Sequence, residues 1–201
     1  MYFVKTPWYV KTVYPSLTWD IKKENTLYLT FDDGPAPGIT DEILRILEHY
    51  QAKATFFVIG ENVLAHRQLY DTILDKGHTT GNHTMHHVNG WKTDNERYFS
   101  DVEACDTIIH ENKFRPPYGR ITYNQIQRLK QDYTIYMWDV LSGDFDTSLH
   151  ADICADQVIE HATSGSIVVF HDSEKAKERV LPALPKVLAH FAKKGFRFES
   201  L

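Results

Sequence analysis

The feature that most constrains this chain is an alternation of short β-rich runs with segments of helical period, which continues from residue 27 to the C-terminus. This alternation is typical of βα units wound around a parallel sheet. Because 201 residues leave room for one domain with at most a short appendage, we expect a single α/β domain. The seven runs predicted as strands are 27–31, 55–59, 78–81, 114–117, 134–138, 166–170 and 196–198.

Helices are predicted between these runs. One begins at Thr40, which can cap it, and its apolar residues recur on one face. Two others end with a lysine directly before Gly77 and Gly195, in the pattern of a glycine that ends a helix before a strand. A further helix is predicted over residues 95–111, where apolar side chains recur at helical spacing.

Composition argues against several functional classes. The formal net charge of −5 and the absence of a basic cluster argue against nucleic acid as a partner. No run approaches the roughly 18 apolar residues of a membrane span. Cys105 and Cys154 are too few for a disulfide framework or a four-thiolate zinc site, and we expect both in the core. Residues 1–24, expected to pack as a segment on the domain of residues 25–201, lack the apolar region of a signal peptide. The chain as written is therefore expected to be cytoplasmic, or exported with its signal removed.

Two adjacent carboxylates follow the first predicted strand. Asp32 and Asp33 stand before Gly34 and Pro35, a sequence that also favours a simple turn. Two carboxylates at the end of a buried strand repel each other unless a cation or hydrogen-bond donors compensate them. A metal ion could supply that compensation.

A histidine cluster follows the third predicted strand. If the chain turns into a helix there, His83 and His87 lie four residues apart on one face, so that both imidazoles can bind one ion. His86 could replace His87, and a solvated loop is the alternative interpretation of the whole cluster. Two histidines and one aspartate would leave the open position that a catalytic zinc needs for water.

Three further polar clusters follow later strands. In the first, Arg115 could pair with a carboxylate and the backbone N–H of Tyr118 could stabilise an oxyanion, although a loop that ends a strand is the plainer interpretation. The loop that contains Asp144 has the composition of a solvated acidic loop, whereas His171 directly follows an apolar strand and is a candidate proton donor. All five clusters stand at the C-terminal ends of predicted strands, where (β/α) barrels of the TIM type carry their active sites.

In order, the segments 30–35, 83–87 and 115–118, the Asp144 loop and the segment 169–171 resemble the five motifs of the NodB-homology polysaccharide deacetylases, carbohydrate esterase family four. The resemblance extends from Leu27 to Leu201. It implies a distorted (β/α)7 TIM-like barrel. It also implies a metal-dependent hydrolysis of acetyl groups on a sugar polymer or oligomer.

The same resemblance assigns the metal ligands. It implies that Asp33, His83 and His87 bind one divalent ion, which favours His87 over His86 as the second histidine. Zn²⁺ is the expected ion, with Co²⁺ and Ni²⁺ as alternatives.

The resemblance also implies the catalytic roles. Asp32 is the general base and Arg115 tethers it. Tyr118 offers its backbone N–H to the oxyanion. Asp144 orients a histidine and tunes its pKa, and His171 is the general acid.

The expected reaction is removal of N-acetyl groups from N-acetylglucosamine units of peptidoglycan, chitin oligomers or a related glycan, by a monomer. The alternatives are an O-acetyl esterase of xylan type, a catalytically silent glycan-binding barrel and a hydrolase of small non-sugar amides. Phe145 stands where the family usually has tryptophan, and Val169 where it commonly has leucine. We expect both to shape the pocket for the acetyl group.

Overall fold

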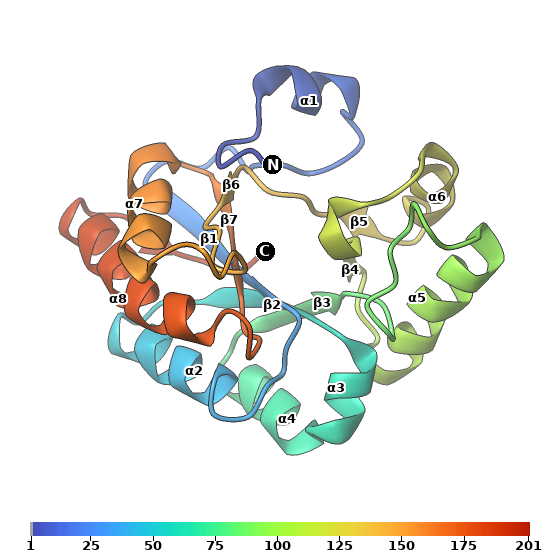
Figure 1. Ribbon diagram of the computed structural model, residues 1–201, viewed down its shortest axis with the longest axis horizontal. Helices are drawn as coiled ribbons and strands as arrows, with labels where there is room; N and C mark the ends of the chain where they lie inside the picture. Colours follow the sequence, from blue (N-terminus) through green and yellow to red (C-terminus); the bar gives the residue numbers. More distant parts are fainter. Residues whose placement is uncertain (1) are drawn as a thin grey trace.

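A parallel sheet forms the centre of the molecule, with strands in the order β5-β4-β3-β2-β1-β7-β6 and β8 paired with β1 (Figure 1). The computed structural model describes residues 2–201; Met1, the first residue of the predicted N-terminal segment, lies outside them. The curled sheet with surrounding helices confirms the predicted α/β fold, a distorted barrel of the TIM type. The strands are β1 Thr26–Asp32, β2 Ala54–Val58, β3 Thr79–Asn82, β4 Lys113–Phe114, β5 Thr134–Ile135, β6 Val140–Leu141, β7 Ile167–His171 and β8 Arg197–Phe198.

The helices lie outside the sheet, and α2 to α8 join successive strands except between β5 and β6 (Figure 1). α2 Thr40–His49 and α8 Lys177–Lys193 cover the same core as β1 and β7. The other helices are α1 Trp8–Val13, α3 Gly60–Ala65, α4 Arg67–Asp75, α5 Asn95–Ile109, α6 Tyr123–Leu129 and α7 Ala151–His161, with one turn of 3₁₀-helix, η1, at Pro117–Gly119. None of the helices within residues 2–201 combines the length and the hydropathy that crossing a membrane requires.

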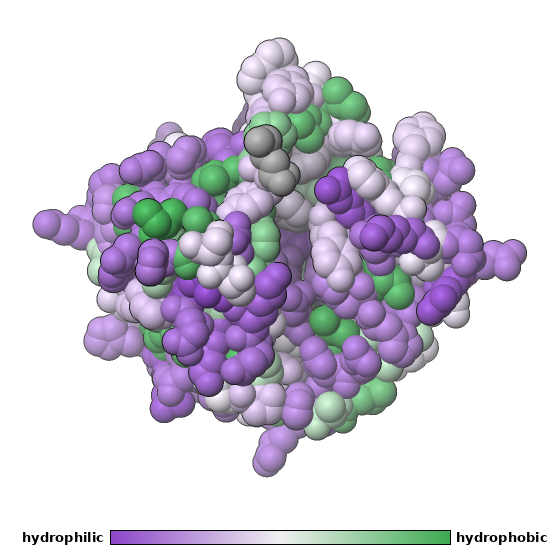
Figure 2. Space-filling view, in the orientation of Figure 1, coloured by the Kyte–Doolittle hydropathy of each residue, from purple (hydrophilic) through white to green (hydrophobic). Residues whose placement is uncertain are grey.

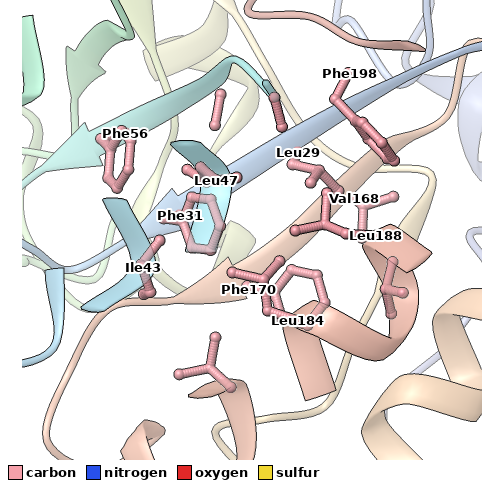
Figure 3. Close-up of a cluster of buried hydrophobic side chains, with 14 of the residues drawn as sticks. Leu29, Phe31, Ile43, Leu47, Phe56, Val168, Phe170, Leu184, Leu188 and Phe198 are labelled. Atoms are coloured by element: carbon pink, nitrogen blue, oxygen red, sulfur yellow. The ribbon is translucent and has the colours of Figure 1, made fainter. Parts of the chain in front are cut away.

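The central strands are buried on both faces, as parallel strands covered by helices are. Every residue of β1 is buried, and the ring of Phe31 stacks on Phe56 and Phe170 at centroid distances of 5.0 and 6.0 Å (Figure 3). Cys105 and Cys154 are free thiols in the same core, as predicted. This packing holds the ends of β1, β2 and β7 in a fixed relation to one another.

The strand predictions fail for the short strands β4, β5 and β6, whereas the equally short β8 lies within the predicted run 196–198. β4 ends at Phe114 because Pro116 and Pro117, which have no N–H, cannot continue the ladder. β5 covers two residues of the predicted 134–138, and β6, paired with β7, was not predicted at all. Two residues carry no periodic pattern, so only their pairing identifies β6 as a strand.

The helix predictions are confirmed in position but wrong at some ends. Gly77 and Gly195 have φ of 73° and 78°, the left-handed conformation expected after a helix. α5 ends at Ile109, two residues before the predicted end. Thr40 is the first residue of α2 rather than its cap, and its hydroxyl takes part in a different set of hydrogen bonds, described below.

The N-terminal segment spans the gap between the two edge strands β5 and β6 (Figure 1). It forms a parallel bridge from Thr18 to Tyr136, beyond β5, and an antiparallel bridge from Lys5 to Val140 in β6. Lys5 and Lys11 both form ion pairs with the buried carboxylate of Asp139, at 2.5 and 2.6 Å. These contacts support the proposal that residues 1–24 pack on the domain of residues 25–201.

Candidate active site

Polar side chains from distant parts of the chain meet at the C-terminal edge of the sheet. Asp32, the last residue of β1, is in register with His171, the last residue of β7. On the other side, β2 pairs with β3, which ends at Asn82 directly before His83, and β3 pairs with β4, which ends directly before Arg115. Parallel strands end at the same edge, so the register alone brings these residues together.

These residues line or support one cleft of about 560 Å³, on the face where Figure 2 shows the surface hollowed near the centre of the view. Arg115 and Asp144 lie behind its wall and are fully buried. The cleft is lined by Tyr2, Asp32, Asp33, His83, His87, Asn89, Tyr118, Gly119, Arg120, Trp138, Leu141, Phe145, Val169, His171, Ser173 and Lys175.

Asp33, His83 and His87 place one donor atom each within 4.8 Å of one another. The Asp33 Oδ1 atom is 3.2 Å from His87 Nε2 and 3.7 Å from His83 Nε2. His83 Nδ1 donates to the carbonyl oxygen of Arg115 at 2.8 Å, since a carbonyl can only accept. That bond leaves the lone pair of His83 on Nε2, the atom that faces Asp33.

The segment His83–His87 is a loop and not the helical turn considered as one possibility, because left-handed residues interrupt it. Thr84 and His87 have φ of 67° and 54°. The side chain of Asn82 accepts from the Thr84 N–H at 2.8 Å and donates to the carbonyl oxygen of Val102 at 2.9 Å, so the loop is held by a residue from α5. The two histidines therefore converge through a folded loop.

His86 lies outside this cluster. Its Nδ1 pairs with Asp101 at 2.6 Å, and 58% of its side chain is exposed. The structure therefore groups His83 and His87 with Asp33 and separates them from His86.

The pKa shifts of Asp33 and His83 suit a metal site. Burial raises the pKa of Asp33, but the hydrogen bond from His87 and the nearby histidines outweigh it and hold the pKa well below its usual range. Burial lowers the pKa of His83 to about 4, so this imidazole is neutral at neutral pH. One carboxylate and two imidazole nitrogens fit a divalent ion such as zinc, with a position open for water.

Asp32 and Arg115 form a buried ion pair on one side of the trio. The Nη1 atom of Arg115 is 2.7 Å from Asp32 Oδ1 and also donates to the Thr30 hydroxyl at 2.7 Å, while Nη2 donates to the carbonyl oxygen of Met137 at 2.9 Å. The guanidinium lies over the ring of Phe57 at 4.1 Å. Burial lowers the pKa of Arg115, and the charge of Asp32 opposes that change. Because the guanidinium of Arg115 is held by these hydrogen bonds and in turn binds Oδ1 of Asp32, the carboxylate of Asp32 has a fixed orientation.

His171 and Asp144 form a second pair on the other side. The two oxygens of Asp144 accept from the Nδ1–H and from the backbone N–H of His171, both at 2.7 Å. Burial lowers the pKa of His171, but the carboxylate of Asp144 more than offsets it, and the pKa rises to about 9. The imidazole is therefore cationic at neutral pH, and Nε2 is the ring nitrogen left for the cleft.

Tyr118 lies in η1 with φ of 59°, in a turn closed by hydrogen bonds from Gly119 and Arg120 to the carbonyl oxygens of Pro116 and Pro117, at 2.9 and 3.0 Å. The residue is 61% exposed, and its ring contacts the ring of His87 at a centroid distance of 4.5 Å.

Phe145 and Val169 also line the cleft. Phe145 packs edge to face against His171 and against Tyr2 of the N-terminal segment, at 5.4 and 5.0 Å. The N-terminal segment thus contributes to the wall of the cleft through Tyr2.

Asp172 is a residue of the site that sequence reasoning missed. It is fully buried, accepts the N–H of Gly34 at 3.0 Å and accepts the hydroxyl of Thr40 at 2.6 Å. Thr40 in turn accepts the N–H of Ala36 at 2.8 Å. Burial raises the pKa of Asp172 to about 8. Asp172 therefore ties the loop after Asp33 to β7 and α2; its place directly after His171 was the only signal in the sequence.

Gly34 is required by this arrangement. A Cβ atom at Gly34 would lie 1.9 Å from the carboxylate of Asp172. On the other side of Asp33, the side chain of Asn62 donates to the Asp33 carbonyl oxygen at 2.7 Å. The backbone of Asp33, which has φ of 85°, is thus held from both sides.

Comparison with known proteins places this geometry in a family. The polysaccharide deacetylase family model matches residues 20–135. A peptidoglycan-N-acetylglucosamine deacetylase of Bacillus cereus is 32% identical over 90% of this chain and 89% of its own length. A chitooligosaccharide deacetylase of Rhizobium leguminosarum bv. trifolii is 28% identical over 89% of this chain and 91% of its own length.

A solved structure agrees along nearly the whole chain. It is that of a peptidoglycan N-acetylglucosamine deacetylase in complex with 4-naphthalen-1-yl-N-oxidanyl-benzamide; it is 29% identical, covers 98% of this chain and 95% of its own, and superposes with a TM-score of 0.89. The five motifs in their order, the barrel fold and the sequence matches all agree. This chain therefore belongs to the polysaccharide deacetylase family with NodB homology, the carbohydrate esterases of family four.

Proposed function

We propose that this protein is a metal-dependent N-deacetylase that hydrolyses N-acetyl groups on N-acetylglucosamine-containing glycans. One observation carries the proposal: the trio of Asp33, His83 and His87 shares one cleft with two ion pairs, one that can supply a base and one that can supply an acid. Asp32 beside Arg115 provides a fixed carboxylate, and His171 beside Asp144 provides a cationic imidazole. The names of the two sequence relatives, deacetylases of peptidoglycan and of chitooligosaccharides, support the substrate class.

Asp33, His83 and His87 would hold the metal ion. When bound, a divalent ion supplies a Lewis acid for the acetamide carbonyl and lowers the pKa of a water molecule toward 7. Zinc suits one carboxylate and two imidazole nitrogens, and Co²⁺ or Ni²⁺ are alternatives with the same ligand types.

Asp32 is the proposed general base. Its Oδ1 is held by Arg115, which leaves Oδ2 to accept the proton of the attacking water. Since Arg115 is fully buried and bonds Thr30 and Met137 as well, it fixes the direction in which Asp32 points. Arg115 acts on the reaction only through Asp32.

His171 is the proposed general acid. An amide nitrogen cannot leave as an anion, so a proton must reach it as the C–N bond breaks. Asp144 keeps His171 protonated. One oxygen of its carboxylate accepts from the Nδ1–H of His171 and the other from the backbone N–H of His171, so Nε2 is left to face the cleft. Asp144 is therefore a positioning residue for His171.

The backbone N–H of Tyr118 is the proposed oxyanion donor, as its turn is held by the prolines before it. Phe145 and Val169 are proposed to bound the acetyl group, since both line the cleft next to His171.

Acetate release tests the proposal directly. The purified protein is treated with chelator, then supplied with Zn²⁺, Co²⁺ or Ni²⁺ and incubated with N-acetylglucosamine oligomers, peptidoglycan fragments and acetylated xylan oligomers. We expect acetate from the N-acetylglucosamine substrates, loss of release with chelator and recovery with added ion. Metal-loaded, folded protein that releases no acetate from any of these substrates would refute the proposal.

A further inference from the structure

Tyr2 lines the cleft but belongs to none of the five polar clusters that follow the strands. It comes from the N-terminal segment, and its side chain is half-buried. Phe145, Val169 and His171 line the same cleft, and they stand more than 140 residues later in the chain. A residue so distant in sequence can act on the site only if the fold holds it in place.

Backbone pairing with β6 fixes the position of Tyr2. Lys5 forms an antiparallel bridge with Val140, and the N–H of Leu141 donates to the carbonyl oxygen of Val4 at 2.8 Å. The start of the N-terminal segment therefore runs along β6 in the opposite direction (Figure 1). Continued along the chain, this antiparallel register brings Tyr2 to the loop that follows β6.

The side chain of Tyr2 contacts that loop on both sides of Asp144. Its ring packs edge to face against Phe145 at a centroid distance of 5.0 Å. Its hydroxyl lies close to Gly143, where an added Cβ atom would come within 2.7 Å of the Tyr2 oxygen. Phe145 in turn packs edge to face against His171 at 5.4 Å. Aromatic contacts therefore run from Tyr2 through Phe145 to the proposed general acid.

The wall of the cleft beside His171 is apolar. Leu141 and Val169 are in register on β6 and β7, and both line the cleft. His171 follows Val169 by two residues and so lies on the same face of β7. The acyl group of a bound amide is attached to the nitrogen that His171 protonates. The position of the Phe145 ring therefore decides how much room the acyl chain has.

We infer that Tyr2 is a specificity-determining residue, which holds Phe145 against His171 and so limits the acyl group to the size of acetyl. This inference rests on the proposed function and adds to it the selection of acyl length. A longer acyl chain needs Phe145 to move aside, and the edge-to-face contact with Tyr2 opposes that movement. Close packing gives such a wall its selectivity, because an added methylene has no free space to enter.

The test compares acyl groups on one glycan. Glucosamine oligomers are prepared with N-acetyl, N-propionyl or N-butyryl groups, and kcat/KM for release of the carboxylic acid is measured with zinc-loaded protein. For the wild-type protein we expect a loss of about tenfold or more for each added methylene. Tyr2→Ala should raise the ratio of kcat/KM for butyryl to that for acetyl by about tenfold, because Phe145 loses its support. A merely structural role would lower all three rates alike and leave the ratio unchanged.

Further variants separate the ring of Tyr2 from its hydroxyl and from the rest of the segment. Tyr2→Phe keeps the ring and should keep the wild-type ratio. Tyr2→Leu replaces the ring with a smaller apolar side chain and should raise the ratio by about threefold or more. It also provides the test if urea unfolding shows that Tyr2→Ala is not folded. The matched control is Tyr9→Ala, which removes an exposed ring of α1 outside the cleft and should leave the ratio unchanged.

The outcomes separate the inference from the function on which it rests. A ratio that rises in Tyr2→Ala and Tyr2→Leu, and stays at the wild-type value in Tyr2→Phe and Tyr9→Ala, supports the inference. A folded Tyr2→Ala or Tyr2→Leu protein with the wild-type ratio overturns it, as does equal hydrolysis of the three acyl groups by the wild-type protein; both results leave the deacetylase proposal standing. No acid released from any of the three by the wild-type protein overturns the proposed function, and this inference with it.

Discussion

Replacement of Asp144 by asparagine tests the general-acid role proposed for His171. The rise in the pKa of His171 from 6.5 to about 9 corresponds to roughly 3 kcal/mol of preferential stabilisation of the imidazolium. Asp144 is fully buried and contributes both a charge and a hydrogen bond, whereas asparagine keeps the shape and loses the charge. The pKa of His171 should therefore fall by about two pH units in Asp144→Asn.

The sign of the effect follows from the role of His171. A general acid works while it is protonated, so the kcat/KM for acetate release should fall as the pH rises through the pKa of His171. In the wild-type protein this alkaline limb is expected above neutral pH, because Asp144 raises the pKa of His171, and in Asp144→Asn it should move to lower pH. The assay is acetate release from an N-acetylglucosamine oligomer between pH 5 and pH 10, with metal at saturation.

Asp146→Asn is the matched control, because this half-buried aspartate lies two residues away and bonds Ser148 instead of His171. Its alkaline limb should stay at the wild-type position. A folded Asp144→Asn protein that keeps the wild-type limb would refute the reasoning, because Asp144 would then not maintain the charge of His171.

Three further substitutions test separate parts of the site. Asp32→Asn should lower kcat by a factor of about 10² or more while zinc binding, measured by calorimetry, is retained; unchanged turnover would remove Asp32 as the base. His171→Ala should reduce hydrolysis of an N-acetyl amide far more than that of an O-acetyl ester, because an alkoxide leaves without full protonation, and equal losses on the two substrates would contradict the general-acid role. Gly34→Ala should lower the free energy of unfolding by about 1–3 kcal/mol and reduce activity as Asp33 shifts, since its Cβ would meet Asp172 at 1.9 Å; urea unfolding indistinguishable from wild type would contradict the packing argument.

Sequence reasoning succeeded for elements whose environment is uniform along their length. β1, β2 and the first four residues of β7 are buried throughout, so they are mainly apolar runs that can be recognised without a structure. It failed for β6, whose two residues are a strand only because β7 lies beside them. The same limit applies to β4, which ends where the prolines begin.

The candidate site divides in the same way. The residue types and their positions after strands indicated a metal site of two histidines and one aspartate and a proton donor at His171, because parallel strands present their C-terminal residues at one edge. The choice of His87 over His86 and the role of Asp32 as the base came from the resemblance to the family. The conformation that joins His83 and His87 was not predictable, since the left-handed Thr84 depends on Asn82, which is held by Val102 in α5. The contact of Asp172 with Gly34 and Thr40 joins residues more than 130 positions apart.

The sequence by itself determined the order of strands and helices and the chemical groups that stand at the strand ends, because burial and backbone hydrogen bonding select residue types locally. Only the tertiary structure decided which of these groups touch. Ion pairs such as Asp32 with Arg115 and Asp144 with His171 form across strands that are distant in the chain, and their strength depends on the loss of solvent around them. The folding of the sheet brings residues of separate motifs into one cleft and buries the groups that support them.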